Sequence, residues 1–188
     1  NGWLKIGKTL PNFGLKVDDH SSFIRGGNIN RTQVTEFEKE GLLFTPFLNP
    51  PLIIEIGSPL LNGLEFTSSL STSLFQNNNS ETLQNFTTQL YFYKNYNLFK
   101  QTSSFSYMID GDLLMLGISG GLNYQSLTWT YEIDQIQNWI NDYTSIAIYD
   151  EIVWEIMQGL QLIAKYDYFD PSTQFQTGSI SRYSIGME

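Results

Sequence analysis

The residues with the clearest chemical potential are carboxylates that recur at short spacing in the second half of the chain. Glu132 and Asp134 stand two apart, and Glu151 and Glu155 stand four apart. Paired carboxylates hydrolyse glycosides when they flank the scissile bond. If these segments are strands, residues two or four apart point to the same face and form a row along it. We therefore expect the carboxylates to line a polar surface rather than to form a catalytic pair.

The only histidine, His20, follows Asp18 and Asp19. These side chains are candidates for a divalent-metal site, or for a histidine ligand to a neighbouring haem. Adjacent residues rarely chelate one ion well, so we prefer a solvated loop tied by salt bridges to Arg25 or Arg31. Two serines follow His20, but the chain has no nucleophile elbow of a hydrolase. We predict no enzyme activity, no metal and no cofactor.

The composition excludes several classes of protein. The 188 residues include no cysteine, which rules out disulfides and thiolate metal sites. The net charge of −9 argues against nucleic acid as a partner, because phosphate binding needs clustered Lys and Arg. Charged residues make up only 15%, and aromatic residues another 15%. Such a surface is unusual for a soluble protein, where charge keeps molecules apart.

Alternating side-chain character predicts the elements that position the carboxylates. In LTWTYEIDQI, Leu127, Trp129 and Tyr131 fall on one parity, whereas Glu132 and Asp134 fall on the other. Alternation of this kind is typical of a strand with one apolar face. It recurs over 64–75, 85–93, 98–109, 113–124, 145–157, 160–168 and the run that ends at Met187. The chain is predicted to be all-β.

The linkers suggest how the strands are connected. Apart from the short DGD turn at 110–112, every other linker is long and polar, and those between are tight. Short turns at one rim and long loops at the other are typical of outer-membrane barrels. We predict an antiparallel up-and-down transmembrane β-barrel, forming one domain over 1–188, of which about ten strands are visible.

A barrel assigns the two faces of each strand. Lipid-facing positions would be Leu127, Trp129, Tyr131 and Trp154. The predicted pore-lining residues are Glu132, Asp134, Glu151, Glu155, Lys165, Asp167 and Arg182. Asp150 falls on the lipid-facing parity, where a charge is costly near mid-bilayer. Folding the hairpin about residue 141 would place Asp150 beside Glu132 and Ile133, towards the looped rim.

The first fifty residues differ from the rest. Residues 17–44 carry much charge and little alternation, so we expect a long loop, with one helical turn possible at 37–44. Four prolines in 45–59 predict rim positions around a short strand at 52–57, because proline cannot donate to a ladder. The alternation is interrupted at both ends, which suggests part of a longer chain.

The segment LKIGKTLPNFGLKVDDHSSFIRGG (4–27) resembles a recurring segment of bacterial outer-membrane porin-like proteins. There, a strand of the form (R/K)-x-G-(R/K)-x-x-P-x-F-G-L leads into a charged loop. The matching residues are Lys5, Gly7, Lys8, Pro11, Phe13, Gly14 and Leu15. Residues 159–188 are similar to the penultimate hairpin of such barrels. The resemblance implies a transmembrane barrel and no particular solute.

Three functions remain open. The first is a porin-like channel of the bacterial outer membrane for passive passage of small solutes or ions, in contact with lipid, either as a homo-oligomer or with a periplasmic or extracellular partner. The second is a sheath or scaffold around a partner such as a multihaem cytochrome. The third is a soluble β-sandwich that binds carbohydrate.

Overall fold

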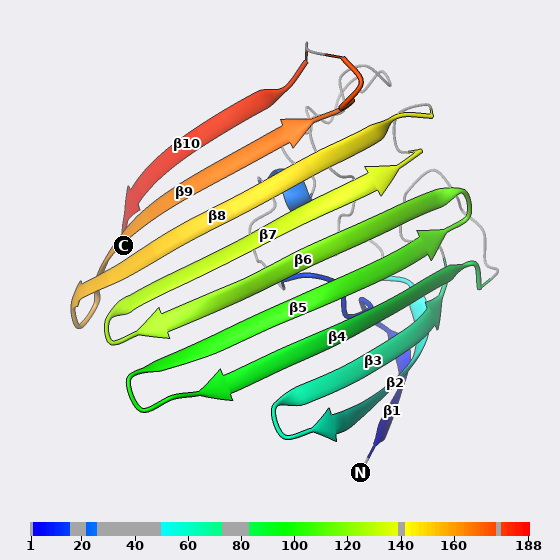
Figure 1. Cartoon of the computed structure of the whole chain (residues 1–188), viewed down its shortest axis with the longest axis horizontal. Coiled ribbons are helices and arrows are strands. Elements are labelled where there is room, and N and C mark those ends of the chain that lie inside the picture. Colours follow the sequence, from blue (N-terminus) through cyan, green and yellow to red (C-terminus); the bar gives the residue numbers. More distant parts are fainter. Residues whose placement is uncertain (1, 16–21, 26–49, 73–82, 139–141, 176–177) are drawn as a thin grey trace.

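The computed structural model describes residues 2–15, 22–25, 50–72, 83–138, 142–175 and 178–188. They form one antiparallel sheet of ten strands in which each strand pairs with its neighbours in the sequence (Figure 1). The predicted all-β up-and-down fold is confirmed. The strands are β1 (Trp3–Lys8), β2 (Leu52–Leu61), β3 (Leu64–Ser71), β4 (Asn85–Asn95), β5 (Phe99–Asp110), β6 (Leu113–Tyr124), β7 (Leu127–Gln137), β8 (Thr144–Met157), β9 (Leu160–Asp170) and β10 (Ile180–Met187). A single 3-10 turn, η1 (Phe23–Arg25), is the only helical element among the described residues. These residues include no helix with the length and apolar character needed to cross a membrane.

The connections alternate in length as predicted. The turns after β2, β4, β6 and β8 are short and lie at one rim of the sheet. The first residue of β1 and the last residue of β10 lie on the same side (Figure 1). At the opposite rim, the connections after β3, β7 and β9 are longer, and the DGD turn between β5 and β6 is short. Gly111 has φ +61° in that turn, and Gly159 has φ +81° in the turn between β8 and β9. Tight hairpins need such left-handed positions.

The strands are staggered progressively across the sheet. One row of directly paired residues begins at Trp3, the first residue of β1, and ends at Ile180, the first residue of β10. The row passes through Trp3, Gly57, Thr67, Gln89, Ser106, Gly117, Asp134, Ala147, Phe169 and Ile180. Because β1 and β10 run in opposite directions, the row climbs from the short-turn rim to the long-loop rim. Closed barrels require a stagger of this kind, although no ladder joins β1 to β10 within the described residues.

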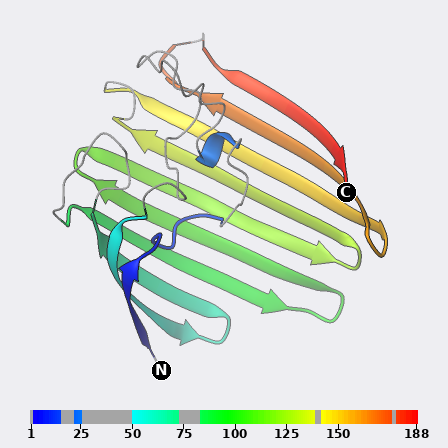
Figure 2. The same ribbon diagram turned by 180° about the vertical axis from the view of Figure 1, so that it is seen from behind.

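The two faces of the sheet differ in character and in cover. The apolar face, which carries Trp129 and Ile133, leaves large hydrophobic side chains exposed from Leu4 in β1 to Tyr183 in β10. The polar face, which carries Glu132 and Asp134, is largely buried. Two stretches of the β1–β2 connection, residues 9–15 and 22–24, lie across it (Figure 2). We call these two stretches together the docked segment.

A small apolar core holds the docked segment to the sheet. Phe13, Phe23 and Ile24 of the segment are buried. On the polar face they meet Met108, Met115, Ile136, Ala147, Tyr149 and Phe169. The core of the described structure therefore lies between the segment and the sheet.

The predicted strand at 52–57 is too short. β2 continues to Leu61 and includes Pro59, which pairs with Glu65 of β3 next to an irregularity in the ladder. The last partner of β2 on the β1 side is Gly57. Proline is tolerated there because, beyond Gly57, β2 has no neighbouring strand on the β1 side to which a backbone N–H would have to donate. Most of the charged loop expected at 17–44, including the turn at 37–44, lies outside the described residues.

Candidate functional site

The candidate site is the polar face of the sheet together with the docked segment. Glu132 in β7 is completely buried, and its Oε2 accepts a hydrogen bond of 2.6 Å from the backbone N–H of Leu15. A hydrogen bond from a backbone N–H to an ionised carboxyl group is stronger than one to a neutral acceptor. Glu132, expected to line a pore, therefore anchors another part of the same chain.

A second anchor is Glu55 in β2, which is 1% exposed. Its Oε2 accepts the backbone N–H of Asn12 at 3.0 Å, and its Oε1 lies 2.6 Å from Nζ of Lys5 in β1. The ion pair supplies the charge partner that a buried carboxylate needs. Lys5 and Glu55 thus fix the point at which the chain leaves β1 and turns across the sheet.

Gly14 sits between these two anchors in a conformation that favours glycine. Its φ is +54°, and a Cβ at this position would collide with the carboxyl group of Glu132. Its N–H donates to Oγ of Ser106 at 3.0 Å, and its carbonyl accepts from Nε2 of Gln89 at 3.2 Å. Both the backbone angle and the close approach require the absence of a side chain here.

Phe13 is seated over Gly117 in β6. A Cβ at position 117 would lie 2.9 Å from the ring of Phe13 and 2.7 Å from Oδ1 of Asp134. Asp134, the second expected pore-lining carboxylate of β7, is completely buried beside this ring. The missing side chain of Gly117 leaves the space that Phe13 occupies.

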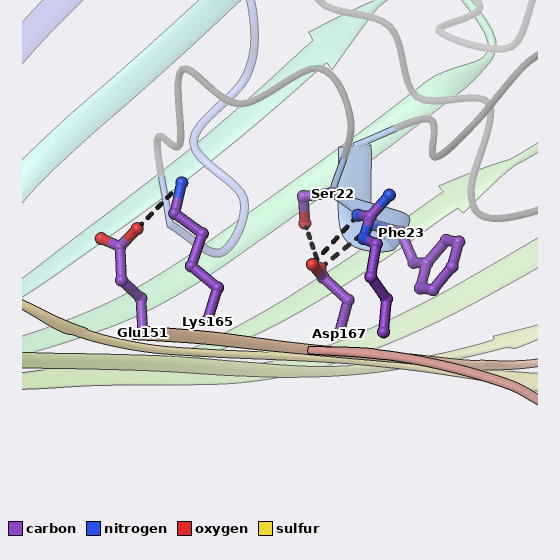
Figure 3. A network of polar contacts seen from close by, with 6 residues as sticks. Ser22, Phe23, Glu151, Lys165 and Asp167 are labelled. Atoms are coloured by element: carbon purple, nitrogen blue, oxygen red, sulfur yellow. Dashed lines mark hydrogen bonds and ion pairs between the residues drawn. The ribbon is translucent and has the colours of Figure 1, made fainter. Parts of the chain in front are cut away.

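Asp167 in β9 provides the third anchor (Figure 3). Its Oδ1 accepts from Oγ of Ser22 at 3.1 Å and from the backbone N–H of Phe23 at 3.4 Å. Its Oδ2 pairs with Nη2 of Arg182 in β10 at 3.0 Å. The Arg182 guanidinium also lies 4.7 Å from the centre of the Phe23 ring, a cation–π distance. Two of the expected pore-lining residues, Asp167 and Arg182, therefore meet each other and the docked segment.

The remaining expected pore-lining residues lie nearer the short-turn rim. Glu151 and Lys165 form an ion pair of 3.1 Å, with side chains 20% and 26% exposed (Figure 3). Glu155, further along β8, is exposed. The docked segment does not cover this part of the polar face.

All four residues expected to face lipid lie on the apolar face. Leu127, Trp129 and Trp154 are exposed, and Tyr131 is half-buried. Whether this face contacts lipid stays a prediction.

The expected position of Asp150 is wrong. Asp150 pairs with Tyr131, one residue away from the predicted partner, and lies in the middle of β8 rather than towards the looped rim. Directly opposed residues of an antiparallel pair share a face, so Glu132 must oppose a polar-face residue, which is Tyr149. The indole Nε1 of Trp129 donates to Oδ1 of Asp150 at 3.0 Å. This bond gives the carboxylate a donor on the apolar face.

Asp18, Asp19 and His20 lie outside the described residues. Among the residues that are described, no group of three potential ligands is placed to hold a metal ion.

Sequence reasoning missed the residues that dock the segment: Glu55, Ser106, Gln89 and Gly117. One signal was available, because apolar Met108, Met115, Ile136, Ala147 and Phe169 all fall on the otherwise polar parity. Apolar side chains gathered at one height of a polar face indicate that something apolar covers them.

No known protein family, curated protein or solved structure matches the chain.

Proposed function

We propose that the chain forms the wall of a porin-like β-barrel in a bacterial outer membrane and allows passive passage of small solutes or ions. The observation that carries this proposal is the exposed apolar face of the staggered sheet. Leu4, Ile56, Leu90, Ile118 and Trp154, on five different strands, are each at least 40% exposed. Soluble monomers rarely expose contiguous apolar surface over more than a few hundred Å². In a bilayer the same surface is favourable.

The open part of the polar face supports a passage for solutes. Glu151 and Lys165 present opposite charges from adjacent strands, and Glu155 extends the acidic row. Charged side chains on the wall of a lumen hold water and tune ion passage. The strand length is also suitable, since β4 to β9 have 11–14 residues and a tilted membrane strand needs about 9–11.

The channel is favoured over the other two functions. A sheath for a protein partner needs a free inner face, whereas part of this polar face is occupied by the chain's own Phe13 and Phe23. A soluble sandwich needs a second layer over its apolar face. No described residue outside the sheet packs there, since the described core lies entirely on the polar side.

Two measurements test the proposal. We expect the intact protein to require detergent for a monodisperse preparation, because the apolar face aggregates in water. Reconstituted into planar bilayers, it should give stepwise conductance. Monodisperse behaviour without detergent, or silent bilayers with verified insertion, would contradict the channel.

A further inference from the structure

We propose that Trp129, Tyr131, Asp150 and Tyr166 form a site on the apolar face that binds the ammonium headgroup of a membrane lipid. We call these four residues the outer-face cluster. The inference rests on the proposed function in one respect, since it requires the apolar face to meet lipid, and it does not require the channel.

Asp150 is a carboxylate without a charge partner on an apolar surface. On the apolar face of β7 to β10, only Asp150 and Asp170, the last residue of β9, carry a charge. The cations of these strands, Lys165 and Arg182, form their ion pairs on the polar face. Within the described residues, the one polar contact of Asp150 is the hydrogen bond from Trp129. A carboxylate in apolar surroundings needs a cation, and a cationic ligand would supply it.

The outer-face cluster lies at the boundary of the apolar band in this half of the sheet. Between Asp150 and the short-turn rim, the apolar-face side chains of β7 to β10 are all hydrophobic, namely Leu127, Trp129, Ile152, Trp154, Ile156, Leu160, Leu162, Ala164, Ile185 and Met187. Towards the long-loop rim, polar side chains join the face, namely Gln135, Gln137, Thr144, Asp170 and Ser181. Tyrosine and tryptophan side chains of membrane proteins gather at the level of the lipid headgroups. We therefore expect the cluster at that level, where a charged lipid group reaches it.

Aromatic rings flank Asp150 on both sides. Asp150 directly opposes Tyr131 in β7 and Tyr166 in β9. The centre of the Tyr131 ring lies 5.1 Å from that of Trp129, and the centre of the Tyr166 ring lies 4.9 Å from that of Tyr183. Aromatic ring faces attract an ammonium group, and a carboxylate beside them adds its charge. The hydroxyl groups of Tyr131 and Tyr166 have no partner in the described part of the chain, so they are available to the phosphate next to the ammonium.

Gly120 in β6 keeps the site open. A Cβ at this position would lie 2.8 Å from the hydroxyl oxygen of Tyr131. The phenol ring therefore leans over β6, on the side of β7 away from Asp150 in β8. Asp150 stays partly exposed, so its carboxylate is accessible from the apolar side.

Lipid retention measured by native mass spectrometry tests the site without relying on conductance. The intact protein in detergent is given equal amounts of phosphatidylethanolamine and phosphatidylglycerol with the same acyl chains, and the bound lipids are counted. We expect about threefold more phosphatidylethanolamine to be retained, the preference of a cation held against ring faces. Asp150→Asn, which keeps an oxygen for the Trp129 indole, should abolish this preference. Asp170→Asn is the matched control on the same face, because Asp170 opposes Ile146 rather than a tyrosine, and it should leave the preference unchanged.

A second variant separates recognition by the rings from the effect of charge. Tyr166→Leu removes a ring without changing the net charge and should also lower the preference. Tyr168→Leu, two residues further along the same face, is its control. An equal fall for Asp150→Asn and Asp170→Asn, or an unchanged preference in Asp150→Asn, would overturn the ammonium site.

The outcomes separate this inference from the proposed function. A preference that depends on Asp150, in a protein that is silent in planar bilayers, would overturn the channel and support the site. No preference in any of the proteins, with Trp154 still quenched by brominated acyl chains, would overturn the site and leave the lipid contact standing. A protein that retains neither lipid would overturn both the site and the contact of the apolar face with lipid.

Discussion

The backbone N–H of Leu15 donates to Oε2 of Glu132 over 2.6 Å, although the two residues are 117 positions apart in the sequence. The bond joins the connection after β1 to the middle of β7. The sequence predicts that Glu132 lines a pore, whereas this bond makes it a buried anchor for the docked segment.

Removal of this anchor should destabilise the protein. Glu132→Ala leaves the backbone N–H of Leu15 without its carboxyl acceptor, at a cost of about 2–3 kcal/mol. Urea unfolding of the protein reconstituted in lipid measures the loss. Glu155→Ala, at an exposed position of the same face, is the control and should change the stability little. Equal stability of the two variants would refute the anchoring role of Glu132.

The space over Gly117 is a second point of sensitivity. Gly117→Val places atoms where the ring of Phe13 lies and should cost about 1–3 kcal/mol through overpacking. The same unfolding assay applies. Gly186→Val in β10 is the control, since nothing lies within 4 Å of a Cβ there. Combining Gly117→Val with Phe13→Ala should recover part of the loss, because the double variant no longer overlaps. An additive double variant would show that the two sites are independent.

The hydrogen bond between Trp129 and Asp150 lies on the face that we propose meets lipid. Trp129→Phe keeps an aromatic ring and removes the indole donor, which should cost about 1 kcal/mol in a bilayer. Trp154→Phe is the control, since its indole donates no hydrogen bond within the described part of the chain. The effect of Trp129→Phe should largely vanish in an Asp150→Ala background. Persistence of the full effect there would assign it to packing instead.

Direct contact with lipid is testable by fluorescence. In a variant whose only tryptophan is Trp154, lipids brominated on the acyl chains should quench emission strongly. A variant that keeps only Trp3, whose ring lies over Gly57 on the polar face, should be quenched less. Equal and weak quenching of both variants would argue against the apolar face as a lipid contact.

Ion preference should depend on the open part of the polar face. Glu151→Lys replaces the ion pair with Lys165 by two cations, so the reversal potential in a salt gradient should shift towards anion preference. Asp150→Asn removes a charge from the opposite face and should leave the reversal potential unchanged. If both variants shift it equally, the charges do not act from within a lumen.

Much of the sheet was predictable because its information is local. Side chains alternate with period two in a strand, so the apolar parity of Trp129 and Trp154 and the polar parity of Glu132 and Asp167 follow from spacing alone. Turn residues such as those of DGD mark where strands end. The pairing of Asp150 was missed by one residue, because it depends on the connection between β7 and β8 and on the requirement that opposed residues share a face.

The sequence by itself therefore determined most of the strands, their order and the two faces of each. Only the tertiary structure decided what covers the polar face. Gly14, Phe13 and Ser22 find their partners in Ser106, Gly117 and Asp167, which are distant in the chain. The local alternation of side chains does not predict such contacts. They form only when the stagger of the whole sheet brings buried carboxyl groups and apolar side chains under one crossing segment.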